Sequence, residues 1–314
     1  MVYLLFAIGL ALLVFGGEWL IKGSVAVAER LGIAPLIIGL TIVAFGTSAP
    51  ELVISLRAAL SGNGGIAVGN VVGSNIANVL LVLGVPLLFS SIYCADKGMK
   101  TTLTFLIGVT VLFMVQMWNG PITRFDGIIL LLCLAAFLYM QFLSARKQKA
   151  ADLAADIHDE IGEPPQNGWL AAGYVIAGLL ALPAGAALCV DAAVEIASRW
   201  GVPDEVVGLT IVAIGTSLPE LATSITAARH GNTSVAVGNV IGSNLFNIAA
   251  IMGVTAAATN VPIGEHILQF DMWVMLAATL FLIALPVFKV SLGRKAGLVL
   301  CAVYLIYLGI TATF

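Results

Sequence analysis

Two glutamates, Glu51 and Glu220, stand alone in long apolar stretches of the sequence, each directly after a Gly-Thr-Ser-x-Pro segment. Carboxylates that face each other in a low dielectric repel and take up protons, unless a cation lies between them. Each glutamate follows a pair of hydroxyl side chains, Thr47 and Ser48 or Thr216 and Ser217. Calcium prefers oxygen ligands and takes about 6–8 of them, whereas zinc or copper would more often call for Cys or His. The pattern predicts a site for a hard cation.

The two glutamates belong to two copies of one sequence. The first repeat runs from Gly39 to Gly84 and the second from Gly208 to Gly253, with no insertion or deletion between them. More than half of the aligned positions are identical, and they include polar and helix-breaking residues as well as aliphatic ones. Apolar bias alone would not reproduce these positions, so the duplication indicates a shared functional unit.

Composition indicates the class of protein. Of 314 residues, 60% are hydrophobic and 10% are charged, and the mean hydropathy is +1.07. These values lie far from those of a soluble domain and indicate a polytopic membrane protein, for which the lipid bilayer is the surrounding partner. The net charge of -3 gives no sign of nucleic-acid binding. The four cysteines are scattered singly and are interpreted as packing residues, and no cofactor is expected.

Ten segments are long and apolar enough to cross a bilayer. They lie near 3–28, 34–60, 66–90, 100–118, 123–144, 168–198, 204–229, 234–258, 267–288 and 296–313. The first segment could also be a secretory signal, but no Lys or Arg precedes it, and it is needed as the counterpart of the sixth. We therefore predict an all-α fold of ten transmembrane helices in two inverted five-helix repeats. The halves are 1–144 and 168–314, joined by a polar linker at 145–167.

The repeats carry two features that shape a site. Gly46 to Pro50 should break or kink its helix, which exposes the backbone carbonyls of Ala44 and Gly46 as ligands. The spacing of Gly69 and Gly73 lets another helix approach closely. Ser74 and Asn78 follow on one helix face, and their copies are Ser243 and Asn247. One such face alone would more often join helices than bind an ion, but two copies beside two broken carboxylate helices favour an ion site.

Lys and Arg counts indicate orientation. Five helices per half make the halves enter the membrane in opposite directions. With both termini outside, most basic residues fall on cytoplasmic connections, among them the central linker. The protein is then a multi-pass protein of the inner (plasma) membrane with a cytoplasmic central loop.

At these motifs the chain resembles the cation/calcium exchanger superfamily, specifically the prokaryotic calcium/sodium antiporters with ten helices and two inverted alpha repeats. The resemblance rests on GTSAPE with GNVVGSNIAN and on GTSLPE with GNVIGSNLFN, and it covers essentially the whole chain. It implies that Glu51 and Glu220 are the principal ion-binding carboxylates. It implies further ligands from Thr47, Ser48, Ser74, Asn78, Thr216, Ser217, Ser243 and Asn247, and from the carbonyls of Ala44 and Ala213.

The resemblance implies exchange of calcium for sodium by alternating access, with calcium and sodium ions as transported partners and one chain sufficient for transport. Some sodium/calcium exchangers carry aspartate at the position of Asn247, and the amide here leaves calcium/proton or other cation exchange as an alternative. A passive channel and an intramembrane hydrolase are rivals from other classes, although no histidine lies near Ser48 or Ser217 to activate a nucleophile. The chain is therefore not expected to be an enzyme.

Charged residues also mark the first and sixth segments. Glu18 and Lys22 have the i, i+4 spacing of an ion pair. The position aligned to Lys22 is Asp191, which Glu195 follows four residues later. Neither segment has the Gly-Thr-Ser-x-Pro break that would fix it to the ion site. We therefore expect these two helices to move together across the other eight.

Overall fold

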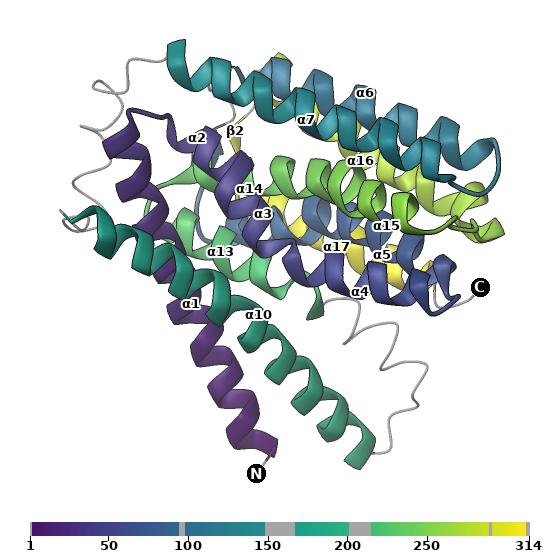
Figure 1. Ribbon diagram of the computed structural model, residues 1–314. Helices are drawn as coiled ribbons and strands as arrows, with labels where there is room; N and C mark the ends of the chain where they lie inside the picture. Colours follow the sequence, from purple (N-terminus) through teal and green to yellow (C-terminus); the bar gives the residue numbers. More distant parts are fainter. Residues whose placement is uncertain (1, 94–97, 148–166, 201–214, 289–290, 312–314) are drawn as a thin grey trace.

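The protein is a bundle of long helices (Figure 1). The computed structural model describes residues 2–93, 98–147, 167–200, 215–288 and 291–311. Within these ranges, 8 helices are long and apolar enough to cross a membrane, or up to 9 if one bent pair counts as a single span. The mostly helical membrane fold predicted from the sequence is confirmed. The count of ten spans stays a prediction, because much of predicted segment 204–229 lies outside the described residues.

The described elements follow the predicted segments in order. The first half contains α1 (Val2–Leu31), α2 (Pro35–Ile38), η1 (Gly39–Val43), α3 (Ala44–Thr47), α4 (Ala49–Leu60), α5 (Gly64–Ala77), η2 (Asn78–Val82), η3 (Pro86–Leu88), β1 (Ile92–Tyr93), α6 (Met99–Trp118) and α7 (Arg124–Lys147). The second half contains α10 (Gly168–Arg199), α13 (Leu218–Arg229), α14 (Thr233–Phe246), η5 (Asn247–Met252), α15 (Gly253–Ala258), η6 (Ile267–Asp271), α16 (Met272–Phe288), β2 (Ser291–Leu292) and α17 (Arg294–Thr311). The predicted linker lies almost entirely outside the described residues.

The predicted break in the second span is present. The helix axis bends by 45° between Leu36–Thr47 and Ala49–Leu60. Ser48 sits at the bend with φ -86° and ψ 4°, outside the helical region. Pro50 then occupies the first turn of α4, where its missing N–H has no helical partner to lose. Ser217, with φ -89° and ψ 5°, precedes α13 in the same conformation, so both repeats begin their glutamate helix in the same way.

Two short backbone pairings tie the halves together. β1 pairs antiparallel with β2, so that Ile92 lies opposite Leu292. Ile122 forms an isolated antiparallel bridge with Val261, with both N–H···O distances at 2.9 Å. The residue offset that takes Gly39 to Gly208 also takes Ile92 to Val261 and Ile122 to Ser291, so the two pairings correspond to each other to within one residue. They lie before and after α6, whose 20 residues span about 30 Å.

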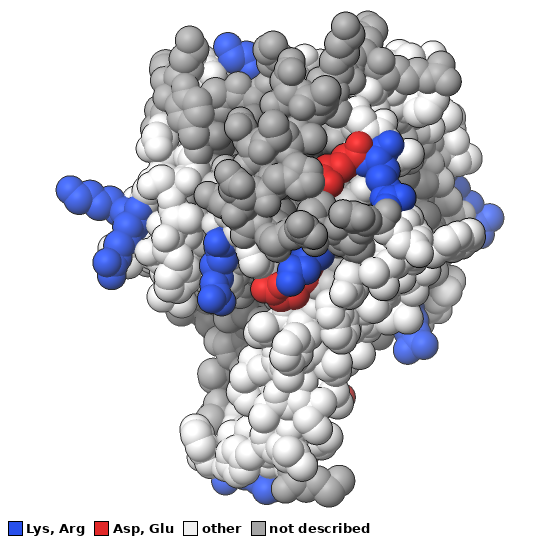
Figure 2. Space-filling view, turned by 90° about the vertical axis from the view of Figure 1, so that its left-hand side faces the viewer, with Lys and Arg blue, Asp and Glu red and all other residues white. Residues whose placement is uncertain are grey.

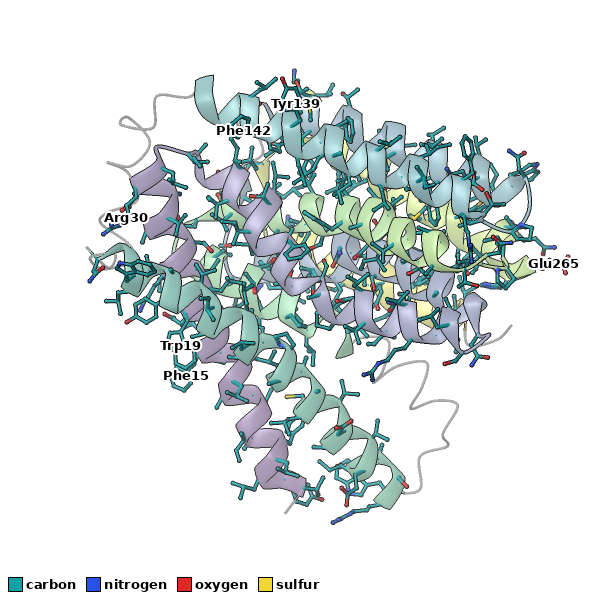
Figure 3. The ribbon with its side chains drawn as sticks, viewed as in Figure 1. Phe15, Trp19, Arg30, Tyr139, Phe142 and Glu265 are labelled. Atoms are coloured by element: carbon teal, nitrogen blue, oxygen red, sulfur yellow. The ribbon has the colours of Figure 1, made fainter. Side chains whose placement is uncertain are left out.

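Helices α1 and α10 form a pair that projects from the rest of the bundle (Figure 1). Their backbones touch at glycines: a Cβ at Gly9 would lie 2.9 Å from the carbonyl of Gly185, and one at Gly178 would lie 2.8 Å from that of Gly16. This seam of small residues allows close helix packing without interlocking side chains. The projecting surface is almost free of charge in Figure 2. The Phe15 and Trp19 rings stack on the outer face of α1 (Figure 3), as expected of a lipid-facing surface.

Helix α14 packs directly on α2, η1 and α3. The close approach predicted at Gly69 and Gly73 is wrong, because a Cβ added at either would have no described atom within 4 Å. It is present at their copies in α14, Gly238 and Gly242. A Cβ on Gly238 would lie 2.8 Å from the Leu36 carbonyl, and one on Gly242 would lie 2.6 Å from the Ala44 Cβ. Such distances are shorter than normal contacts, so only glycine lets this helix reach the segment that leads into the break.

We predict that Gly242→Ala destabilises the protein by about 1–3 kcal/mol, because the added methyl forces two buried backbones apart. Thermal unfolding of the purified protein in detergent measures the effect. Gly108→Ala in α6 is the matched control, since a Cβ added there would have no described atom within 4 Å. An equal shift in both variants would contradict the close-packing interpretation.

Candidate functional site

Glu51 and Glu220 are both buried, each with a relative exposure of 1%. Each lies in the first turn of its helix, α4 or α13. The free N–H groups of a helix N-terminus favour negative charge, so both carboxylates are placed where the backbone helps to hold them. The hydroxyl of Ser48, three residues before Glu51, bonds to Glu220, so the two first turns lie close together. That the two glutamates meet in one ion site stays a prediction.

The hydroxyl residues of the first break reach across to the second repeat. Ser48 Oγ donates to Glu220 Oε1 at 3.1 Å, and Thr47 Oγ1 lies 3.3 Å from Asn239 Oδ1. Both Thr47 and Ser48 are buried. The first break and the second glutamate helix thus form one continuous polar region.

The matching asparagines Asn70 and Asn239 support the glutamate helices from behind. Asn239 Nδ2 donates to the Glu220 carbonyl at 3.3 Å and to Ser224 Oγ at 3.0 Å. Asn70 Nδ2 makes the same two contacts in the first repeat, with the Glu51 carbonyl and Ser55 Oγ. Sequence reasoning did not assign these residues to the site. The signal was available, because both stand at the same position of the duplicated AVGNV motif.

The predicted amide ligands lie where their helices change winding. α5 becomes the π-helical turn η2 at Asn78, and α14 becomes η5 at Asn247. Such turns shift the hydrogen-bond ladder and are frequent at functional sites. η2 packs on α13 and η5 packs on α4, so each amide segment contacts the glutamate helix of the other repeat. Ser74 and Ser243 are buried one turn earlier.

Six buried side-chain oxygens at the predicted positions have no hydrogen-bond partner among the described residues. They belong to Glu51, Asn78, Ser217, Glu220, Ser243 and Asn247. Buried polar atoms are almost always hydrogen-bonded, so a concentration of unpaired oxygens calls for a ligand. Carboxylate, amide and hydroxyl oxygens are the ligand set of a hard cation.

Three further predicted ligands, Ala44, Ala213 and Thr216, each have a different outcome in the structure. The Ala44 carbonyl accepts from Ser48 N at 3.1 Å and from Thr47 Oγ1 at 3.3 Å, so its role as a ligand stays a prediction. Ala213 lies outside the described residues. Thr216 is half-buried beside Ser217 and lines a cavity together with Ser74.

In the part of the chain that the structure describes, no group of three or more His, Cys, Asp or Glu side chains is arranged to hold a metal ion.

A family model described as "sodium/calcium exchanger protein" matches residues 1–143 and 170–313. The chain belongs to the sodium/calcium exchanger family. This confirms the family that the duplicated motifs indicated, and the protein is accordingly an integral membrane protein of a cation antiporter family.

Relatives match over nearly the whole chain. The CaxA protein of Alkalimonas amylolytica is 38% identical over 96% of this chain and 95% of its own length. Sodium/calcium exchanger MaX1 of Methanosarcina acetivorans is 32% identical over 98% of this chain and 97% of its own length. A structure of the sodium-calcium exchanger NCX_Mj matches with a TM-score of 0.84 and 30% identity, over 98% of this chain and 97% of that one.

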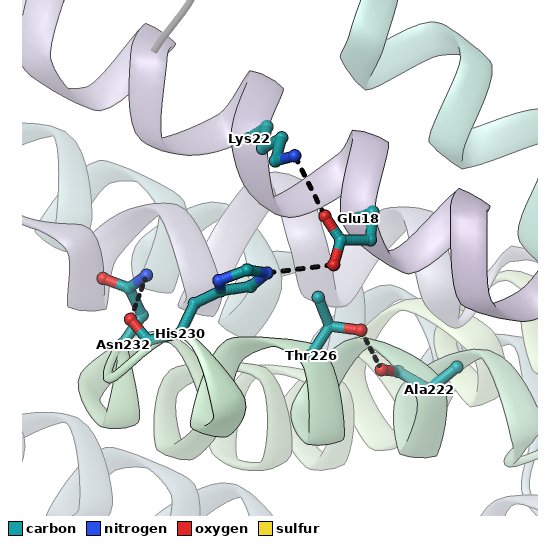
Figure 4. Close-up of polar contacts among 6 residues, drawn as sticks. All are labelled: Glu18, Lys22, Ala222, Thr226, His230 and Asn232. Atoms are coloured by element: carbon teal, nitrogen blue, oxygen red, sulfur yellow. Dashed lines mark hydrogen bonds and ion pairs between the residues drawn. The ribbon is translucent and has the colours of Figure 1, made fainter. Parts of the chain in front are cut away.

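The polar residues of α1 contact the exchanger core at α13. Glu18 Oε2 pairs with Lys22 Nζ at 3.1 Å, which confirms the predicted ion pair. Glu18 Oε1 lies 3.0 Å from His230 Nε2 at the end of α13 (Figure 4). A Cβ on the neighbouring Gly17 would lie 2.9 Å from Thr226 Oγ1. α1 thus contacts α13, the helix of Glu220, through the partly exposed side chains of Glu18 and His230.

The polar residues of α10 have a different environment. Asp191 is exposed, and Glu195 pairs with Arg199 on the same exposed helix surface. Asp191 therefore occupies the position equivalent to Lys22 without making an equivalent contact among the described residues.

We predict that Asn239→Ala lowers stability by about 1–3 kcal/mol, because buried partners on Ser224, Thr47 and the Glu220 backbone lose their hydrogen bonds. The thermal unfolding midpoint in detergent is the measurement. Gln269→Ala serves as control, because Gln269 donates to Glu265 and both side chains are exposed. An Asn239 variant as stable as the control would show that these contacts contribute nothing.

Proposed function

We propose that this exchanger moves calcium in one direction and sodium in the other through a single site between Glu51 and Glu220. The observation that carries the proposal is the set of unpaired buried oxygens around two mutually repelling carboxylates. One calcium ion neutralises both charges. Sodium ions can neutralise them in its absence, so the two occupancies exclude each other, and this exclusion is the physical basis of exchange.

Sodium is proposed as the counter-ion, with protons as the alternative. The name of the MaX1 relative and the NCX_Mj likeness favour sodium. The ligand set would be completed by oxygens of Thr47, Ser48, Ser74 and Asn78 and of their repeat partners Thr216, Ser217, Ser243 and Asn247.

Alternating access is proposed to come from α1 and α10. α10 lies against the glycine of both breaks: a Cβ on Gly46 would collide with Leu179, and a Cβ on Gly215 with Val190. A shift of α10 along its axis would therefore displace side chains that pack next to both breaks, beside the two glutamate helices. α1 would follow through the glycine seam, and its contact with His230 would break and reform during the cycle.

The proposed site is built within one chain, so a monomer would suffice for transport. We propose an orientation in the plasma membrane with both termini outside and the central linker in the cytoplasm. The excess of Lys and Arg on the connections that would then be cytoplasmic supports this arrangement.

A hydrolase finds no support in the described contacts. The Ser48 hydroxyl donates to Glu220, and the described histidines bond elsewhere, His230 to Glu18 and His266 to Asp271. A nucleophilic serine would need an adjacent base such as histidine. A channel would let calcium reach equilibrium without accumulating it, which the following experiment distinguishes.

We predict that vesicles containing the purified protein accumulate labelled calcium when an outward sodium gradient is imposed, and that a proton gradient alone drives far less uptake. Glu51→Gln or Glu220→Gln should reduce this uptake by roughly tenfold or more, because each removes a charge that the transported ion must balance. Insertion and monodispersity in detergent should be retained.

Glu265→Gln is the matched control, since it removes an exposed carboxylate at the outer end of the bundle. Uptake at the wild-type rate in both site variants would eliminate the proposed site. Uptake that only equilibrates calcium would favour a channel.

We also predict that single cysteines along Val14 to Ser24 and Pro183 to Glu195 change thiol reactivity when sodium replaces calcium. The four native cysteines are removed first. Cysteines in α16, which is not proposed to move, provide the control. Constant reactivity in α1 and α10, with changes instead within Ile42 to Ser55, would show that other helices carry the motion.

A further inference from the structure

Asp271 is the third buried carboxylate among the described residues, after Glu51 and Glu220. Asp271 ends η6 within the candidate span Ile267–Val287, and its exposure is only 8%. A buried acid at such a position is costly and is a functional candidate until its partner is known. The sequence analysis did not single out Asp271, although a lone carboxylate in an apolar stretch was the signal that indicated Glu51.

Both oxygens of Asp271 are held by neighbours that face it. His266 Nδ1 lies 2.6 Å from Oδ2, and Tyr307 Oη on α17 donates to Oδ1 at 2.9 Å. The His266 side chain is 30% exposed. Its neighbour Glu265 lies at the outer end of the bundle (Figure 3). The cluster therefore connects a water-accessible position with a buried carboxylate.

The same cluster lines a cavity shared with the candidate ion site. The cavity has a volume of about 420 Å³. Its polar wall combines residues of the cluster with residues of both repeats: His266, Asp271, Tyr307, Asn70, Ser74 and Thr216. Ser74 and Thr216 are among the proposed ligands, so the cavity reaches from the cluster to the edge of that site.

The other half of the chain fills the equivalent position without a charge. The offset between the repeats takes Thr102 to Asp271, and it takes Thr110 to Thr279, whose hydroxyls make the same bond to the carbonyl four residues earlier. Thr102 is buried and accepts from Gln141 Nε2 at 3.4 Å. A neutral hydroxyl, that of Thr102, is therefore sufficient for packing at this position in the first half. The carboxylate of Asp271 in the second half needs an explanation other than packing.

We propose that Asp271 is a staging site for the transported cation. The inference rests on the proposed exchange. The Asp271 carboxylate lines the same cavity as Ser74 and Thr216, so it would draw a cation toward these proposed ligands.

The experiment measures the calcium concentration that half-saturates sodium-driven uptake into vesicles at one fixed pH. Asp271→Asn should raise this concentration on the order of threefold to tenfold, with an unchanged maximal rate, because one nearby charge is lost.

Asp271→Thr, which copies the first half, repeats the test with a residue that the fold already accepts at the equivalent position. Glu265→Gln, beside His266, should behave as wild type. An Asp271 variant that loses maximal rate, while its half-saturating calcium concentration stays at the wild-type value, would show a structural role and overturn the staging site. Absence of sodium-driven uptake in the wild type would overturn the exchange itself, and the staging site with it.

Discussion

Two carboxylates that are buried close together in a membrane protein are unfavourable as a pair of free anions. Either a cation between them or protons bound to them must offset their charge. Glu51 and Glu220 are almost fully buried and repel each other. Neither is neutralised by a basic side chain in the described contacts, and Glu220 instead accepts a hydrogen bond from the Ser48 hydroxyl. The rest of the core can be understood as the scaffold that holds this unfavourable arrangement together until an ion enters.

That scaffold depends on breaks in regular helix geometry. The bends at Ser48 and Ser217 place each glutamate in a first helical turn, where the backbone favours negative charge. The π turns that begin at Asn78 and Asn247 redirect amide side chains at the point where each faces the opposite repeat. Asn70 and Asn239 then tie the carbonyl of each glutamate to its neighbouring helix. Irregular backbone is tolerated at membrane depth because it is enclosed by protein.

The sequence predicted the membrane fold, the position of the break and the candidate carboxylates, because these follow from composition, proline chemistry and a duplicated motif. It did not predict the π turns, since a shift of one residue in the hydrogen-bond ladder leaves no mark in apolar periodicity. The support by Asn239 was also missed, because a repeated amide can serve packing or ligation equally until its partners are known. Asp271 was overlooked for a different reason: outside the repeats there was no second copy to draw attention to it.

The two halves of the protein differ in the contacts that surround the duplicated residues. The glutamates, hydroxyls and amides are duplicated, so nearly the same set of side chains would face either side of the membrane. α1 is fastened to α13 through His230, whereas α10 carries its charges on an exposed surface. Asp271 likewise replaces the neutral Thr102 of the first half. A symmetric site can bind ions from both sides alike, and these unmatched contacts give the protein a means to treat the two sides differently.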